Sequence, residues 1–508
     1  MLLLATWLGC SCQPPPPEIL IVTVDTLRAD RLGFAGHDGA HTPALDALSS
    51  RSRWFSQATT PLPRTTPALA SLHTGRWPHH HGAREVGDRV EITETLASTL
   101  AAAGWQTAAV SAMAVAGPEQ GMDQGFDSFH LDHDARAATI TEAALSIAAA
   151  TDPTKPLLMW VHYADPHFPY QPPADGPLQP SAPGCRALVR RVARKQLRRV
   201  EIYADRGGVA SSVLGGCRAL YDAEIAAVDA AIGDLLEGWH TLRRSEGWLD
   251  RLRGSPSWIV FSADHGENQG EAGLFYEHGP DVNDASLRIP LLIEGTGVEP
   301  GRDDGVVRLE DVLPTLLSLA HVPAPDGLDG LDLGPRLQGL PGEPRIAVAE
   351  SGSALHAGLF DHVVSGGSRL SCVNGARYSL CRGAGGRQTL HDHSVDPDLR
   401  EDLAAELPEV VATLEAAAAI WPPESARQRA ARTERFKLVG TPQLQGGYSW
   451  ALYDLAADPS ESVDVSSDHP EVVAQLHEAL AAWDAPTPEA LERDEDELQA
   501  LRALGYVE

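Results

Sequence analysis

Three short apolar runs of the chain each end in polar side chains that can take part in chemistry. The run EILIVTV is followed by Asp25, PLLMWVHY by a segment that contains His167, and SWIVFSA by Asp264 and His265. Continuous apolar runs of this length predict strands that are buried on both faces. The carboxyl ends of parallel strands form one edge of a sheet, where ligands bind. We therefore expect these polar residues to meet at that edge.

Between the apolar runs lie stretches with helical spacing. ITEAALSIAAA and YDAEIAAVDAAIGDLLEGW are two clear cases. Strands that alternate with helices indicate a mostly parallel sheet with helices on both faces. The pattern predicts an α/β fold, a three-layer αβα arrangement around one large sheet.

The C-terminal part contains an internal repeat. Residues 389–421 match residues 451–483 without gaps, and RYSL at 377 corresponds to RFKL at 435. Each copy is typical of a strand, a hairpin, a second strand, an acidic turn and a helix. We expect a smaller, structural α+β part with an internal duplication. The predicted division of the chain is a leader and proline-rich tether (1–17), a catalytic domain with an insertion at about 180–215 (18–345), and the duplicated region (346–508).

Composition narrows the possible functions. The 508 residues are 43% hydrophobic and carry a formal net charge of −30. Such a chain can bury a large core, and its negative charge argues against binding nucleic acid, which requires a positive surface. One segment, 186–201, is strongly basic. It is expected either to attract an anionic polymer or lipid headgroup or to be a solvated helix face.

The N-terminus is typical of an exported protein. Its apolar run is too short to span a bilayer and is followed by Cys10, Cys12 and four prolines. The sequence LGC resembles a bacterial lipoprotein box, which would place a lipid on Cys10 and attach the protein to a membrane. A cleaved signal and a start without a targeting role stay open. We expect a periplasmic or lipid-anchored location at the cell envelope.

The other four cysteines suit an oxidising compartment. Cys372 and Cys381 flank VNGARYSL, in which Asn-Gly is a strong hairpin signal, so a cross-strand disulfide is expected. Cys185 and Cys217 bracket the insertion. They either close it as a loop or stay as two buried thiols.

The strand-end residues predict a metal site. Asp25, Asp264 and His265 offer carboxylate oxygens and an imidazole, which are ligands for one divalent ion. The imidazole favours Mn²⁺ or Zn²⁺, with Ca²⁺ or Mg²⁺ possible.

A candidate nucleophile lies in TTPALASLHTG. Thr65 comes before Thr66 and Pro67, a pattern that predicts a threonine cap and a proline at the first position of a helix. The free N–H groups of a helix N-terminus favour an oxyanion. The hydroxyl of Thr65 is therefore either a metal-activated nucleophile or an ordinary cap.

Eight motifs, in this order, resemble those of bacterial sulfatases of the alkaline phosphatase superfamily: ILIVTVDTLRADRLGFAG, TPALASLHTGRWPHHHG, VHYADPHFPY, YDAEIAAVDAAIG, SADHGENQGE, EHGPDVNDASLRIPLLI, VLPTLLSLA and LRALGYVE. The resemblance implies an alkaline phosphatase-like fold and a metal held by Asp25, Asp264 and His265. It places Thr65 at the position of the nucleophile and implies catalytic roles for His167 and His278. His162 and Arg64 are the expected substrate contacts, whereas the histidines at 79–81 are expected to form a structural turn.

The chain departs from that family at the reacting group. Sulfatases carry CxPxR or SxPxR, whose first residue is oxidised to formylglycine, whereas this chain has TTPAL with Leu69 in the arginine position. The second aspartate of the family's DD pair is Thr26, and the GKxH signature is absent from the sequence. Threonine cannot yield the aldehyde, so no formylglycine is expected.

These departures favour phosphorus chemistry. A threonine sulfate would be a stable ester, whereas water can attack a phosphothreonine directly. We expect cleavage of a phosphodiester or phosphonate ester through Thr65, in a small molecule, glycan or lipid headgroup. Sulfuric ester hydrolysis by a route without formylglycine and a catalytically inactive binding protein stay open.

Overall fold

The computed structural model describes residues 16–193, 211–242, 256–271, 274–352, 360–365, 368–374, 377–382, 388–392, 401–420, 427–443 and 447–484. Cys10, Cys12 and the expected lipid attachment lie outside the described residues, as do residues 194–210 of the insertion. Within the described part of the chain, no helix combines the length and the apolarity needed to cross a bilayer.

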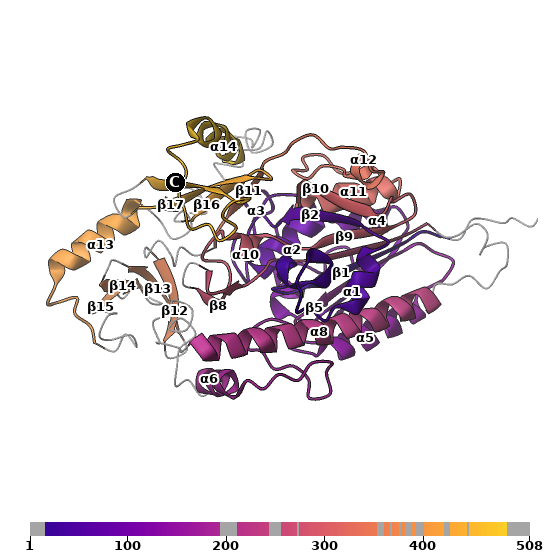
Figure 1. Ribbon diagram of the computed structural model, residues 1–508, viewed down its shortest axis with the longest axis horizontal. Coiled ribbons are helices and arrows are strands. Elements are labelled where there is room, and N and C mark those ends of the chain that lie inside the picture. The colour runs from indigo at the N-terminus through magenta and orange to yellow at the C-terminus, as the bar shows by residue number, and fades with distance from the viewer. Residues whose placement is uncertain are drawn as a thin grey trace, which may run out of the picture.

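One eight-stranded sheet forms the centre of the fold (Figure 1). Its order is β10-β2-β9-β6-β1-β5-β3-β4, and β9 alone in this sheet runs antiparallel to its neighbours. The strands are β1 (Glu18–Val24), β2 (Arg53–Thr59), β3 (Gln106–Ser111), β4 (Ser128–Leu131), β5 (Leu157–Tyr163), β6 (Ser257–Ala263), β9 (Leu291–Gly295) and β10 (Gly301–Arg308). The mostly parallel sheet confirms the α/β prediction.

Helices cover both faces of this sheet. One group packs α5 against α8 and α8 against α1, and the other joins α2, α4 and α11. The helices of this part are α1 (Pro43–Ser49), α2 (Thr65–Thr74), α3 (Pro78–His81), α4 (Leu96–Ala102), α5 (Ala137–Ala150), α6 (Pro183–Ala193), α8 (Ser211–Leu242), α10 (Asp284–Leu287), α11 (Val312–Leu319) and α12 (Gly334–Leu337). Every residue of β1 and β5 is buried, as their unbroken apolar runs predict.

Two four-stranded antiparallel sheets follow along the chain, each with its own helix (Figure 1). The first consists of β12 (Phe360–Ser365), β13 (Ser368–Asn374), β14 (Tyr378–Arg382) and β15 (Gln388–Asp392), with α13 (Pro408–Ile420). The second consists of β11 (Ala347–Glu350), β16 (Arg429–Arg432), β17 (Phe436–Pro442) and β18 (Tyr448–Asp454), with α14 (Pro470–Trp483). The division of the chain at 345/346 stays a prediction.

Equivalent contacts in the two small sheets confirm the duplication. Arg377 pairs with Asp392 at 2.7 Å, and Arg435 pairs with Asp454 at 2.7 Å. The backbone N–H of Leu390 donates to Asp402 at 3.1 Å, and that of Leu452 donates to Asp464 at 3.0 Å. These pairs occupy matching positions of the repeat. The same local interactions therefore support the same fold twice.

A buried ionic cluster attaches the second small sheet to the large domain. Lys437 is fully buried and pairs with Asp284 at 3.1 Å and with Glu461 at 2.9 Å. Asp284 begins α10, and the carbonyl oxygen of Ser286 in that helix accepts a hydrogen bond from the N–H of Gly266 at 2.8 Å. The C-terminal part thus supports the loop that follows β6.

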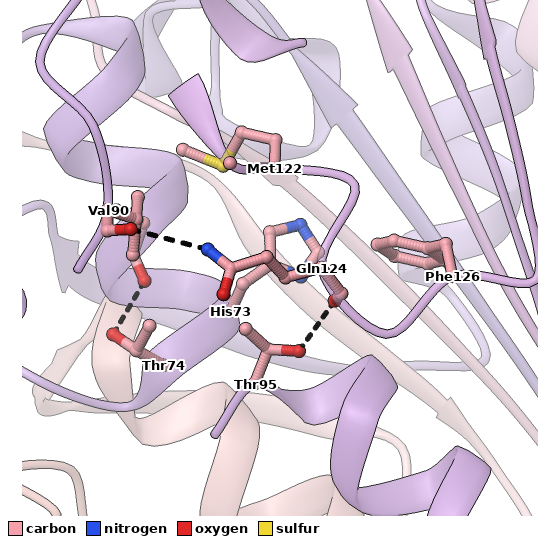
Figure 2. Close-up of a pocket in the computed structure, with 9 residues that line it drawn as sticks. His73, Thr74, Val90, Thr95, Met122, Gln124 and Phe126 are labelled. Atoms are coloured by element: carbon pink, nitrogen blue, oxygen red, sulfur yellow. Dashed lines mark hydrogen bonds between the residues drawn. The ribbon is translucent and has the colours of Figure 1, made fainter. Parts of the chain in front are cut away.

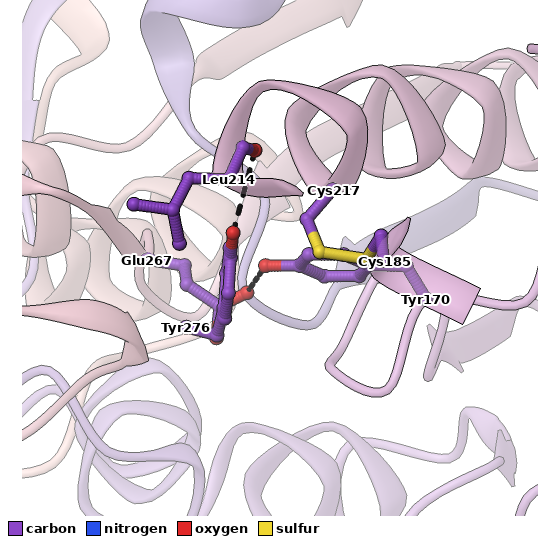
Figure 3. The surroundings of a disulfide bond; sticks show 6 residues. All are labelled: Tyr170, Cys185, Leu214, Cys217, Glu267 and Tyr276. Carbon is purple, nitrogen blue, oxygen red and sulfur yellow. Dashed lines mark hydrogen bonds between the residues drawn. A yellow bond between two sulfur atoms is a disulfide. The ribbon is translucent and has the colours of Figure 1, made fainter. Parts of the chain in front are cut away.

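A disulfide joins Cys185 of α6 to Cys217 of α8, so the expected closure of the insertion is confirmed (Figure 3). Both cysteines are fully buried, and their Cα atoms are 5.1 Å apart. Cys372 lies directly opposite Cys381 in the ladder of β13 and β14, and Cys381 is disulfide-bonded. The hairpin geometry therefore agrees with the expected cross-strand pair.

Peptide mapping of the oxidised protein without reductant should recover Cys185 linked to Cys217 and Cys372 linked to Cys381. Cys185 and Cys217 are separated by 32 positions in the sequence. Because this link restricts the unfolded state, its reduction should lower stability by about 3–4 kcal/mol. A reduced sample is the control for the mapping. Free thiols at all four positions in oxidised protein would contradict both links.

Candidate active site

Three predicted ligands meet at the carboxyl edge of the large sheet. Asp25 follows β1, and Asp264 and His265 follow the neighbouring β6, whose last residue pairs with Val24. One donor atom from each of the three side chains lies within 4.8 Å of the others, and all three side chains are buried. The parallel register of the two strands therefore places the ligands side by side.

The chemistry of these donors fits a divalent cation. Asp25 Oδ1 and Asp264 Oδ2 are buried and have no hydrogen-bond partner among the described residues. Burial raises the pKa of Asp25 well above its ordinary value and raises that of Asp264 to about 7, and it lowers the pKa of His265 to about 3. Nδ1 of His265 lies 2.9 Å from the carbonyl oxygen of Gly266, to which it donates. The lone pair of Nε2 is thereby left for a metal.

The residue after Asp25 has an unusual backbone. Thr26 has φ of 54°, which is uncommon for a β-branched residue. Its N–H donates to Asp264 Oδ1 at 3.1 Å, and its carbonyl oxygen accepts from the hydroxyl of Tyr221 at 2.7 Å. These bonds hold the strained turn and orient the Asp264 carboxylate toward Asp25.

Thr65 does not act as a helix cap. Helix α2 begins at Thr65, its N-cap is Arg64 without a side-chain capping bond, and Pro67 is its third residue instead of its first. The predicted cap geometry is therefore wrong. Thr65 Oγ1 instead lies 3.4 Å from Asp25 Oδ2 and 3.4 Å from His265 Nε2. The hydroxyl of Thr66, the next residue, has a different partner and donates to the carbonyl oxygen of Val115 at 2.8 Å.

His162 lies on the inner side of the same cluster. It is fully buried on β5, its Nδ1 is 2.9 Å from Thr23 Oγ1, and its Nε2 is 4.0 Å from Asp25 Oδ2. Trp160 donates to the same threonine oxygen at 2.9 Å. Burial lowers the pKa of His162 to about 3, so the imidazole is neutral. Its predicted contact with substrate stays a prediction.

His278 and His167 lie on the other side of His265. The rings of His278 and His265 are 4.4 Å apart, and His167 lies 5.3 Å from His278. Nδ1 of His278 is 3.3 Å from Glu267 Oε1. Two ring nitrogens near the cluster can supply protons, which suits the catalytic roles implied by the resemblance.

Two residues of this site were missed by the sequence reasoning. Glu267 is fully buried three residues after Asp264, and the hydroxyl of Tyr170 donates to its Oε2 (Figure 3). The Arg28 side chain donates to the carbonyl oxygen of Glu267 at 3.1 Å. Glu267 could have been predicted as a site residue, because its carboxylate lies in the same strand-end segment as Asp264. Nothing in the sequence around Tyr170 indicates that it belongs to the site.

The three consecutive histidines have structural contacts, as expected for a turn. His81 Nε2 is 3.0 Å from Ser71 Oγ, His80 pairs with Asp329 at 2.7 Å, and the His79 ring lies 4.8 Å from that of Trp483 in α14. The strand-end Asp165 accepts from the N–H of Ala137 at the start of α5. These residues position helices.

A cavity of about 10 Å³, enough for one water molecule, lies beside His73 of α2 (Figure 2). His73 comes eight residues after Thr65 in this helix. Its lining combines apolar side chains, among them Met122 and Phe126, with polar ones. The polar side chains include His73, whose ring nitrogens have no hydrogen-bond partner among the described residues. Burial lowers the pKa of His73 to about 3. Eight residues of helix span about 12 Å, so this cavity is separate from the ligand cluster. Leu69, on the same helix, belongs to the apolar core.

The amino-acid sequence of the chain is similar to those of known sulfatases. Residues 17–322 match the family model described as Sulfatase. The chain is 28% identical to an ulvan-active sulfatase of Formosa agariphila over 355 residues, which are 63% of this chain and 65% of that protein. It is 25% identical to a choline-sulfatase of Rhizobium meliloti over 68% of this chain and 76% of that protein. The chain thus spans slightly less than two thirds of the first relative.

Solved structures share the fold. A phosphonate monoester hydrolase of Agrobacterium radiobacter superposes with a TM-score of 0.61 at 19% identity, covering 97% of this chain and 96% of that chain. A structure in complex with its substrate D-glucosamine-2-N,6-O-disulfate superposes with a TM-score of 0.62 at 17% identity, covering 92% and 97%. At these identities the likeness concerns the fold alone, and it confirms the predicted alkaline phosphatase-like architecture.

Proposed function

The chain belongs to the sulfatase family, and from this premise we propose that it is a metal-dependent hydrolase of anionic esters in which Thr65 is the nucleophile. One observation carries the proposal. Thr65 Oγ1 lies 3.4 Å from both Asp25 and His265, two of the three residues that fit a metal. Thr65 makes no capping bond in α2, and its hydroxyl is directed to these two side chains instead.

The residues around Thr65 can support nucleophilic attack. Its hydroxyl donates to Asp25 Oδ2, which can accept the proton at a distance typical of an enzyme without substrate. The N-terminus of α2 adds a favourable field for negative charge at the reacting centre. A bound divalent ion would supply further charge stabilisation and would lower the pKa of a hydroxyl in contact with it.

The proposed reaction has two displacements. In the first, Thr65 Oγ1 attacks phosphorus, its proton passes to Asp25 Oδ2, and the bond from phosphorus to the alcohol breaks. His167 or His278 supplies the proton that the leaving alcohol takes. In the second, water attacks the phosphothreonine and returns a proton to that histidine. The bond to Oγ1 breaks, and Thr65 regains its proton from Asp25.

The charges of the site favour a singly charged substrate. Asp25, Asp264 and Glu267 carry three buried carboxylates. A divalent ion held by Asp25, Asp264 and His265 would, together with the guanidinium of Arg64, offset their negative charge. A phosphodiester or phosphonate ester brings one negative charge to this balance, whereas a phosphate monoester brings two. We propose the diester or phosphonate ester as the substrate class.

Sulfate esters are the second candidate, and the family match favours them. Relatives of this chain are named as sulfatases. Those names do not say which residue stands at the position of Thr65. Because a threonine sulfate would be stable, this candidate requires direct attack on sulfur by water.

Purified, metal-loaded protein should hydrolyse a phosphodiester or a phosphonate ester faster than the matching phosphate monoester and sulfate ester. Nitrophenyl esters that share one leaving group allow the comparison by absorbance, and metal-free protein is the control. Faster sulfate ester cleavage would replace the phosphorus proposal by the second candidate. No turnover of any ester, in protein that still binds metal, would indicate a binding protein.

We further propose that the protein is exported and acts at the cell envelope. The disulfide between Cys185 and Cys217 supports this location, because disulfides persist in oxidising compartments.

A further inference from the structure

Arg64, which precedes Thr65, is enclosed by glycines from two distant parts of the chain. A Cβ atom on Gly279 would lie 2.6 Å from Arg64 Cζ, and a Cβ atom on Gly352 would lie 2.8 Å from Arg64 Nε. Both separations are shorter than van der Waals contact. Glycine at these two positions therefore makes the space that the half-buried guanidinium occupies.

The enclosed guanidinium belongs to the active site. Gly279 directly follows His278, and its carbonyl oxygen accepts from the N–H of Gly352 at 2.7 Å. The ring of His278 lies 4.4 Å from that of His265, one of the three candidate metal ligands. Three segments, around residues 64, 279 and 352, thus hold a cation beside the ligand cluster.

Two ion pairs lie close to this enclosure. Arg84 lies 2.6 Å from Glu350, and Arg427 lies 2.8 Å from Glu85. Within each pair the two charges offset each other, and both pairs hold the segments around Arg64 in place.

We propose that Arg64 binds the non-bridging oxygens of the ester and thereby makes an anionic ester the preferred substrate. This inference rests on the proposed function and deepens it. A guanidinium presents parallel N–H donors to two oxygens of a tetrahedral anion, and Arg64 is adjacent in the chain to the attacking hydroxyl. Gly352 lies in the C-terminal part, so this subsite also requires residues beyond the large sheet.

Binding of inorganic phosphate and inorganic sulfate to metal-loaded protein tests the proposal by calorimetry, without turnover. Arg64→Gln should weaken phosphate binding about 10- to 100-fold, as expected for the loss of hydrogen bonds to a charged group. Arg64→Lys should lose part of the affinity, because an ammonium lacks the planar pair of donors.

Two further variants keep the test decisive. Gly352→Ala leaves the arginine in place but intrudes on its guanidinium, so it should also weaken phosphate binding. Arg302→Gln removes a positive charge from an exposed side chain that pairs with Asp304, and it should bind phosphate like the parent.

Unchanged phosphate and sulfate affinity in Arg64→Gln, or in Arg64→Lys and Gly352→Ala if the glutamine variant does not fold, would overturn the assignment. Failure of the parent to bind either anion would overturn it as well. A parent protein that hydrolyses no ester, yet binds phosphate in a manner that depends on Arg64, would refute the proposed hydrolysis and retain the anion subsite.

Discussion

Thr65→Ala should abolish ester hydrolysis, whereas Thr65→Ser should keep much of it. The serine variant retains a hydroxyl that can donate to Asp25 and attack the ester, and the alanine variant has no nucleophile. Removing a nucleophile lowers kcat by several orders of magnitude, up to on the order of 10⁶-fold. Steady-state rates on the best ester measure the effect.

Folding stability provides the control for this pair of variants. Because Thr65 makes no capping bond in α2, alanine should cost no more than about 1 kcal/mol of unfolding free energy. Mass spectrometry of protein quenched during turnover should find a phosphoryl group on Thr65. If Thr65→Ala turned over at the parental rate, hydrolysis would have to proceed by direct attack of water.

Asp264→Asn should lose bound metal and most activity while the protein stays folded. The amide keeps an oxygen for the N–H groups of Thr26 and His265, which donate to Oδ1 at 3.1 and 2.7 Å, but it removes the negative charge. Loss of a residue that only orients a metal ligand typically weakens metal binding about 10- to 100-fold. Because Asp264 is a charged ligand itself, its loss should weaken metal binding by more than this. Elemental analysis after dialysis measures the metal content.

Asp165→Asn is the matched control, because Asp165 also follows a strand of the sheet but accepts from the start of α5. It should retain metal like the parent protein. Equal metal content in the Asp264→Asn variant and the parent would remove Asp264 from the ligand set.

The same carboxylate makes metal binding depend on pH. Burial raises the pKa of Asp264 to about 7, so its proton competes with the metal below that pH, and metal affinity should fall as the pH drops below about 7. In the metal-free protein the folded pKa lies above the unfolded value of 3.8. Stability should therefore decline as the pH rises from about 4 to 7, and Asp264→Asn should flatten this decline in thermal unfolding scans.

Local patterns along the chain were enough to predict the large sheet and the metal ligands. A continuous apolar run such as β1 is buried wherever it packs, and in a parallel sheet the residue that follows such a strand lies at the carboxyl edge. Asp25 and Asp264 could be predicted for this reason, although 238 residues separate Thr26 from its hydrogen-bond partner Asp264. The repeat was equally visible, because each copy carries its own acidic turn.

The direction of individual side chains was decided by the tertiary structure. The sequence indicated a helix start near Thr65, but packing against Val115 and Gly87 turned Thr66 outward from the cluster and left Thr65 facing Asp25 and His265. Packing likewise brought Tyr170 to Glu267. It also brought Gly352 to Arg64, although the two residues lie far apart in the sequence. Such contacts depend on how separate elements pack, whereas the strand ends depend on the pattern within one element.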